Sequence, residues 1–140
     1  MTGDFGIGVH ALTYLNHKQC SLNSEQLAEN ICTNPARVRK IMAKLRQAGL
    51  VETREGGGGG YQFTLAPESV TLRQVADAVE ARFVSGKASG DPDMDCQIAS
   101  GIGAVLDEIY LDLDGICRKK MELLTILDID RRIFQNAEKG

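Results

Sequence analysis

The sequence predicts an α+β fold that is mainly α, and three observations support this prediction. Helical periodicity runs through most of the chain, only two short stretches have the composition of strands, and these two stretches are neighbours. A chain of 140 residues, with 43% hydrophobic and 25% charged residues, has the size and composition of one compact domain, or of one small domain with a helical arm.

Three helices are expected in the first third of the chain. The first covers about residues 4–18, where apolar side chains recur at helical spacing. The second is capped by either Asn23 or Ser24, and Asn23 as the cap can form a capping box with the glutamine three positions later. The third begins at Asn34 and Pro35, a cap followed by proline at the first helical position, and ends before Gly49. The second and third helices would be joined by a tight turn.

A two-stranded hairpin is expected next, with strands at residues 50–54 and 61–65 around the five glycines 56–60. A phosphate-binding loop would need a lysine, a hydroxyl residue and a helix after its glycines, whereas Tyr61 and a strand follow here. Glycines allow a hairpin tip to lie against a DNA backbone or in the minor groove, although the tip can also be merely mobile. Helix, turn, helix and hairpin in this order predict a winged helix-turn-helix.

The rest of the chain is predicted to be helical, with one break. A capping box at residues 71–74 starts one helix, a long helix runs from about 98 to 124, and a short amphipathic helix follows from 126 to 134. The predicted division is a winged helix-turn-helix DNA-binding domain (1–82), a flexible linker loop (83–97), and a long dimerisation helix with a C-terminal tail (98–140).

The long helix carries two apolar seams. The second seam consists of Leu106, Tyr110, Leu113, Cys117, Met121 and Leu124. Since only one seam can pack on the chain's own domain, the other would face water unless it paired with a second copy. A twofold-related pair would also present two recognition helices to successive major grooves. We therefore expect a homodimer, with its interface at Ile98, Ile102, Val105, Ile109, Leu113 and Ile116.

Positive charge is concentrated in the third helix and the first strand. The net charge is −3, yet residues 37–54 carry six basic residues and one acidic residue, while residues 83–140 carry seven basic and eleven acidic ones. One face of the third helix is apolar, and the other has small residues flanked by long polar ones, a surface that can approach a major groove. A solvated basic face is the alternative. The DNA contacts expected on this helix are Asn34, Ala36, Arg37, Arg39, Lys40 and Lys44, and Arg54 is expected to accompany the wing.

Two stretches, LRQAGLVETREGGGGGYQF (45–63) and VTLRQVADAVE (70–80), resemble the IscR-type (Rrf-two) family of bacterial winged-helix transcription regulators, and so does the ending LLTILDI (123–129). The resemblance implies a homodimer that binds a palindromic operator in double-stranded DNA, usually as a repressor. It puts the family's contacts on the third helix at Ala36, Arg37, Arg39 and Lys40, and those of the wing at Arg54 to Gly59, including Gly57 and Gly58. The family often has an arginine just before the wing glycines, where this chain has Glu55.

The four cysteines, Cys20, Cys32, Cys96 and Cys117, are widely spaced, and we expect reduced thiols. Several members of the family that this chain resembles hold an iron–sulfur cluster through three closely spaced cysteines, but only Cys96 lies in that region here. The next cysteine is 21 residues on, about 30 Å along a helix. We therefore predict no metal and no cofactor. Cys96 remains a candidate sensor thiol, although three nearby aspartates are expected to raise its pKa.

Other classes of function have little support in the sequence. The chain has no convincing nucleophile–base set, no paired catalytic carboxylates and no apolar run of about 20 residues that would span a membrane. We therefore expect a cytoplasmic, non-enzymatic regulator that binds DNA in a sequence-specific way. A winged-helix module for protein interaction, or a thiol-based redox regulator that uses Cys96, are the alternatives.

Overall fold

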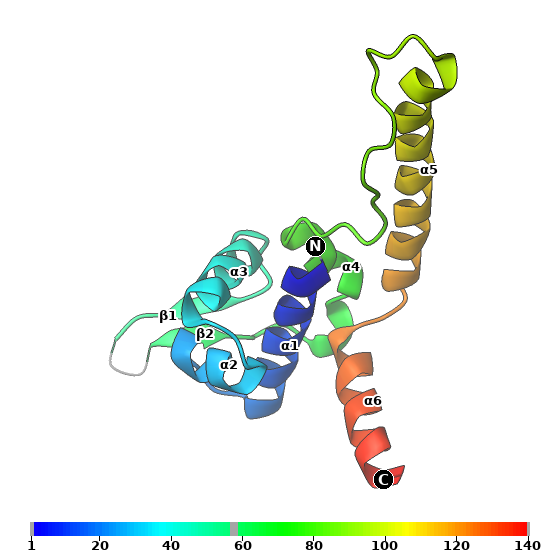
Figure 1. Cartoon of the computed structure of the whole chain (residues 1–140). Coiled ribbons are helices and arrows are strands. Elements are labelled where there is room, and N and C mark those ends of the chain that lie inside the picture. The colour runs from blue at the N-terminus through cyan, green and yellow to red at the C-terminus, as the bar shows by residue number, and fades with distance from the viewer. Residues whose placement is uncertain (1, 57–58, 140) are drawn as a thin grey trace.

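The computed structural model describes residues 2–56 and 59–139 and shows a mainly helical fold with one small sheet (Figure 1). The predicted class, α+β and mainly α, is therefore confirmed. The helices are α1 (Thr2–Lys18), α2 (Ser24–Ile31), α3 (Pro35–Gln47), α4 (Leu72–Ala78), α5 (Gln97–Met121) and α6 (Ile126–Lys139), and the strands are β1 (Glu52–Arg54) and β2 (Gly60–Gln62). A short 3₁₀ turn, Pro67–Ser69, precedes α4.

Helices α2 and α3 form the helix-turn-helix, and their ends are set by local capping. Asn23 and Gln26 form the predicted capping box at the start of α2, with each side chain bonded to the other residue's backbone N–H. The Asn34 side chain accepts a hydrogen bond of 2.7 Å from the backbone N–H of Ala36, and Pro35 is the first residue of α3. Gly49 has φ +78°, the left-handed conformation expected just beyond a helix end.

The two strands form an antiparallel hairpin in which Thr53 faces Tyr61. Backbone bonds between Leu22 and Tyr61 attach this hairpin to the segment before α2. A Cβ on Gly60 would lie 2.4 Å from the carbonyl oxygen of Leu22, so this position requires glycine. The hairpin next to α2 and α3 completes a winged helix-turn-helix, as predicted.

Both strands are shorter than predicted, and the prediction of their bounds was wrong. The backbone N–H of Leu50 bonds to the carbonyl of Leu45 and so closes the end of α3 instead of joining the ladder. Leu50, Val51 and Phe63 are buried in the core beyond the paired segment. Their apolar character therefore reflects burial and not strand pairing.

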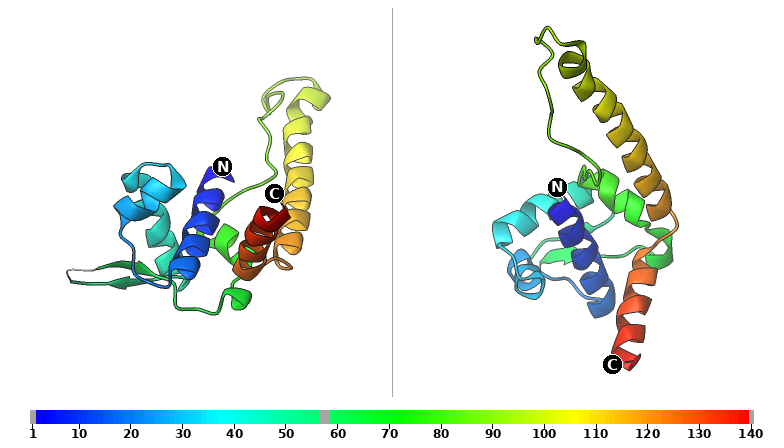
Figure 2. Two further views of the ribbon diagram at one scale, coloured as in Figure 1. Left: turned by 90° about the horizontal axis from the view of Figure 1, so that it is seen from below. Right: turned by 45° about the vertical axis from the view of Figure 1, so that its right-hand side comes forward.

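Helix α1 is the centre of the core, since it packs against α2, α3, α4 and α6. Figure 2 shows these helices around α1, with the hairpin extending from one side. The inward residues of α3 are Val38, Ile41, Met42 and Leu45, which are all buried, as the helical pattern predicts. Helix α3 is therefore fixed to the body of the protein by its apolar face.

Helix α5 extends away from this body. The segment before α5 leads outward to the far end of the helix and lies alongside it (Figures 1 and 2). The backbone N–H of Asp91 bonds to the carbonyl of Ala99, and Gly86 lies against the Tyr110 ring, where a Cβ would be 2.3 Å from a ring carbon. The helix ends at Met121, before the predicted Leu124, because a turn intervenes and the Leu124 carbonyl bonds to the backbone N–H of Leu72.

Helix α6 is attached to the start of α4 by backbone hydrogen bonds. The N–H of Ile126 bonds to the carbonyl of Val70 at 3.0 Å, and Ile126 itself is fully buried. Among the helices in the part of the chain that the structure describes, none has the length and apolar character needed to cross a bilayer.

Candidate nucleic-acid interface

The outward face of α3 is open to solvent. Ala36 and Ala43 are exposed at its centre, and Lys40 and Gln47 are exposed on the same side. Lys44 is half-buried at the edge of this face. Small residues at the centre allow close approach, while long side chains at the edges can reach base edges or phosphates. The surface has the shape and chemistry that the sequence analysis expected.

The first turn of α3 offers backbone donors to an anion. Asn34 uses its side-chain oxygen to cap this turn, so in this structure its first role is structural. The backbone N–H groups at the start of a helix carry a partial positive charge that attracts phosphate. Asn34 thus holds these groups in place at the end of the helix where Ala36 and Arg37 are exposed.

Two of the basic residues on α3 are held by acidic residues of other helices. Arg37 Nη2 lies 3.1 Å from Asp4 Oδ1 of α1. Arg39 Nη1 lies 3.6 Å from Glu25 Oε1 of α2 and 3.3 Å from the hydroxyl of Ser24. These ion pairs could not be predicted from the local sequence, because their partners come from separate helices.

Lys40 differs from its neighbours on α3. It is exposed, and the structure gives it no ion pair with any residue in the ranges 2–56 and 59–139. Arg37 and Arg39 must rearrange or share their donors to contact DNA, whereas Lys40 need not. Lys40 can therefore bind a phosphate or a base without first breaking an ion pair.

The wing lies beside α3, and its first strand ends at Arg54, which is exposed and pairs with Gly60 in the hairpin register. The backbone N–H of Gly59 bonds to the carbonyl of Gly56 at 2.8 Å. The predicted contacts Gly57 and Gly58 lie outside the described residues.

The predicted dimer seam on α5 is exposed in the single chain. Five of its residues have exposed fractions from 43% to 75%, and the sixth, Ile102, is half-buried; the five are Ile98, Val105, Ile109, Leu113 and Ile116. Apart from Leu113, which both seams share, the second seam is covered by the chain itself: Met121 is buried, and Leu106, Tyr110, Cys117 and Leu124 are half-buried. The preceding segment covers part of this second seam, since Gly86 lies against Tyr110.

A buried carboxylate joins α5 to the end of the winged domain. Asp114 accepts hydrogen bonds from the backbone N–H groups of Phe83 and Val84, at 2.7 and 3.1 Å, and pairs with Arg118. Burial of Asp114 disfavours its charge, but these donors outweigh it and hold the pKa of Asp114 below its ordinary value. Phe83 also packs edge-on against Phe5 of α1, with ring centroids 4.9 Å apart.

Cys96 corrects one expectation from the sequence. It is exposed and occupies the cap position before α5, where the nearby backbone N–H groups of Ala99 and Ile98 lower the pKa of its thiol. The prediction that nearby aspartates raise this pKa was wrong, because the donors at the start of α5 dominate the environment of the sulfur.

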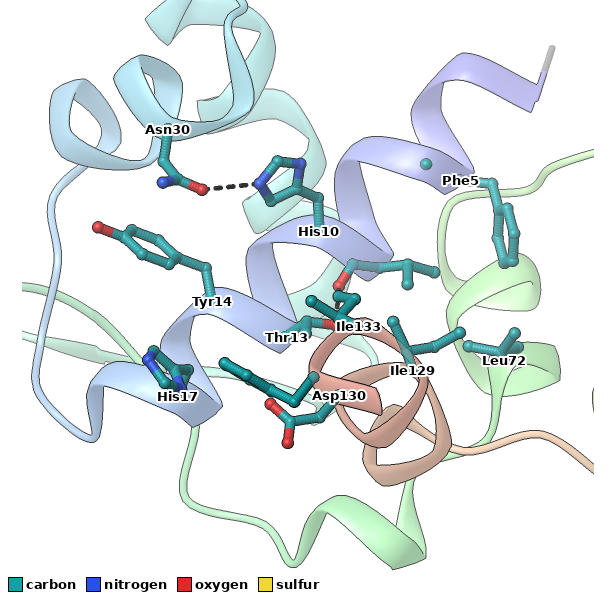
Figure 3. A pocket seen from close by; sticks show the side chains of 13 residues that line it. Phe5, His10, Thr13, Tyr14, His17, Asn30, Leu72, Ile129, Asp130 and Ile133 are labelled. Atoms are coloured by element: carbon teal, nitrogen blue, oxygen red, sulfur yellow. Dashed lines mark hydrogen bonds between the residues drawn. The ribbon is translucent and has the colours of Figure 1, made fainter. Parts of the chain in front are cut away.

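A groove of about 460 Å³ lies between α1 and α6, and the sequence analysis missed it (Figure 3). Most of its lining is apolar, including Phe5, Val9, Ile129 and Ile133. At one end His10 Nε2 and Asn30 Oδ1 lie 2.7 Å apart. The groove arises from the packing of two helices that are distant in the sequence, so no local pattern indicates it.

Comparison with known proteins identifies relatives over nearly the whole chain. The model of a family described as "Rrf2: Iron-dependent Transcriptional regulator" matches residues 1–131. YwgB of Bacillus subtilis is 39% identical over 46% of this chain and 41% of its own length. YwnA of the same organism is 22% identical over 91% of this chain and 95% of its own length.

Solved structures share the fold. A protein from Lactobacillus plantarum described as a transcriptional regulator has a TM-score of 0.79 and 25% identity, with coverage of 99% of this chain and 98% of that one. IscR of T. potens has a TM-score of 0.69 and 18% identity, with coverage of 95% and 87%.

The description of that family as iron-dependent raises the question of an iron site. Iron–sulfur clusters are held by several thiolates at one point. Cys96 and Cys117 lie on α5 about 30 Å apart. In the described ranges there is no group of three or more His, Cys, Asp or Glu side chains that is suited to hold a metal ion. The residues of the described chain therefore do not fit such a group.

Proposed function

The chain belongs to the Rrf2 family of DNA-binding transcriptional regulators, and on that premise we propose that it acts as a homodimeric repressor that binds a palindromic operator. This family regulates transcription and does not catalyse reactions. The proposal covers the mode of DNA binding, the residues that contact DNA and the interface between the two copies.

The exposed face of α3 is the observation that carries the proposal. Its apolar side is buried in the core, and its outer side combines Ala36 and Ala43 with Lys40 and Gln47, all exposed. Such a helix can enter a major groove without any change in its own packing. Arg54 lies at the end of the adjacent wing strand and supplies a cation for the backbone beside that groove.

The interface between copies is argued from α5. A row of apolar residues whose exposed fractions reach 75% is unfavourable in water. A twofold axis parallel to this row would bury it against the same row of a second chain. The same axis relates the two copies of α3, and a symmetric protein of this kind matches a palindromic operator.

The experiment that tests this function is capture of genomic DNA fragments by the purified protein at moderate salt, followed by sequencing. We expect a shared palindromic sequence near promoters and a log–log salt slope steeper than about −4 for the dimer. Repression is checked with a reporter gene downstream of the recovered sequence. If no duplex is retained even at low salt, the alternative of a protein-interaction module is favoured.

A thiol-based response at Cys96 is the second candidate function. The specific observation in its favour is an exposed thiol with a lowered pKa, because the thiolate is the reactive form. Mild peroxide treatment should change the operator affinity of the native protein but not that of a Cys96→Ser variant. Equal responses of the two proteins would exclude this role for Cys96.

A further inference from the structure

Arg37 is the basic residue on α3 that is fixed most directly by another helix. Its Nη2 donates to Oδ1 of Asp4 in the first turn of α1, 33 positions earlier in the chain, at 3.1 Å. Neither side chain is buried: Arg37 keeps 48% and Asp4 38% of its side chain exposed. The ion pair therefore lies at the surface, between the start of α1 and the start of α3.

The local sequence of α1 makes room for this arginine. A Cβ on Gly3 would lie 2.7 Å from Arg37 Nη2, so the guanidinium lies directly over the backbone of the first turn of α1. That end of a helix repels a cation, because its backbone N–H groups carry partial positive charge. Asp4 is the acidic residue of that turn, and its carboxylate offsets this repulsion.

We propose that Asp4 is a positioning residue that sets the DNA sequence discrimination of the protein by orienting Arg37. The proposal rests on the proposed function and adds a residue outside the helix-turn-helix to it. A guanidinium has five donors in a planar fork. When one nitrogen is bound to Asp4, the remaining donors point in a restricted set of directions beside the first turn of α3.

Orientation matters because base contacts specify a sequence while phosphate contacts do not. An arginine that is free to move can follow the phosphates of any duplex and adds affinity without discrimination. An arginine held by Asp4 can use its remaining donors only where the base edges or phosphates of the bound sequence lie within reach. The Asp4 carboxylate also repels phosphates, but this lowers the affinity for every duplex alike and does not itself discriminate between sequences.

The ion pair itself contributes little to folding, as exposed pairs are typically worth about 0–1 kcal/mol. Loss of Asp4 should therefore alter recognition more than stability. A positioning role for Asp4 predicts altered DNA recognition at nearly unchanged stability, whereas a structural role predicts a loss of stability.

The test compares Asp4→Asn with Glu29→Gln. The control removes one negative charge from an exposed site on α2 for which the structure gives no ion pair among the described residues. For each protein, the dissociation constant is measured for the genomic duplex recovered above and for a scrambled duplex of equal composition. We expect Asp4→Asn to lower the ratio of specific to unspecific affinity by up to about fivefold, mainly through tighter binding of the scrambled duplex, while Glu29→Gln shifts both affinities in parallel.

A cycle with Arg37→Ala decides whether the effect acts through that arginine. In an Arg37→Ala background, Asp4→Asn should leave the affinity ratio unchanged, and Asp4→Glu in the native background should retain most of the discrimination. A parallel change of both affinities in Asp4→Asn, or an equal drop of the ratio without Arg37, would overturn the inference. Failure to recover any duplex would instead refute the proposed function.

Discussion

Asp114 and Arg118 lie one turn apart on α5, and Arg118 Nε donates to Asp114 Oδ2 at 3.0 Å. Arg118 also pairs with Asp77 of α4 and donates to the carbonyl of Ala81. Asp114 in turn binds two backbone N–H groups at the end of the winged domain. This pair therefore attaches α5 to α4 and to the segment that follows it.

Replacement of Asp114 by alanine should destabilise this attachment. The change leaves two backbone donors and the Arg118 guanidinium without their partner, and we expect a loss of about 3 kcal/mol in the free energy of unfolding. Thermal or urea unfolding measures it. An alanine variant of the exposed Asp112, two positions earlier on α5, serves as the control and should change stability by less than about 0.5 kcal/mol.

The same carboxylate should make stability depend on pH in the acid range. The folded-state pKa of Asp114 is lowered, so its contribution is complete above the unfolded value of about 4 and is lost as the pH falls through the folded-state pKa. Melting temperatures of the native protein and of Asp114→Asn should therefore converge as the pH is lowered below about 4. A constant difference between them down to pH 2 would contradict the assignment.

Replacement of Lys40 by alanine should weaken operator binding by about 1–3 kcal/mol if this residue reads a base. If it binds a phosphate instead, affinity should fall for all duplexes and the salt slope should decrease by about one per chain. Arg131→Ala, which removes an exposed cation from α6, is the matched control. Native affinity of both variants would mean that the exposed face of α3 does not contact DNA.

A glutamate at Ile109 should separate the dimer into single chains. Ile109 lies in the exposed seam, so the new charge would be buried between two copies. Leu111→Glu is the control, since Leu111 is also exposed but lies on roughly the opposite side of α5. Sedimentation equilibrium should give a monomer for Ile109→Glu and a dimer for Leu111→Glu. The opposite pattern would move the interface to the other side of the helix.

Cys96 should react with iodoacetamide faster than Cys20 or Cys32 at neutral pH. All three thiols are exposed, and backbone donors at the start of α5 lower the pKa of the Cys96 thiol, which favours its reactive thiolate form. Mass spectrometry after short exposure gives the relative rates. Equal rates at the three sites would show that the cap position of Cys96 does not activate its thiol.

The features that the sequence predicted well are those decided by neighbours in the chain. The capping boxes at Asn23 and Thr71 each depend on residues three positions apart, and both form as expected. The buried side of α3 follows from helical spacing alone. Such patterns were sufficient for the winged helix-turn-helix and for the exposed face of α3.

Features that depend on distant segments were not predicted. Arg37 and Asp4 are 33 positions apart in the sequence. The groove is lined by α1 and α6, which come from opposite ends of the chain. The strand bounds failed for a related reason, since Leu50 and Phe63 are apolar because they enter the core. Composition therefore indicated their burial, but their hydrogen-bond partners were decided by the tertiary structure.

Helix α5 is unbroken from its first residue to Asp114, so a small tilt at the Asp114 end produces a larger displacement at the other end. This span has 18 residues from Gln97 to Asp114 and is about 27 Å long. A tilt of about 10° at the Asp114 end would displace the far tip by about 5 Å, close to one helical turn. In the proposed dimer, the anchor at Asp114 would therefore set how far apart the two copies of α3 lie.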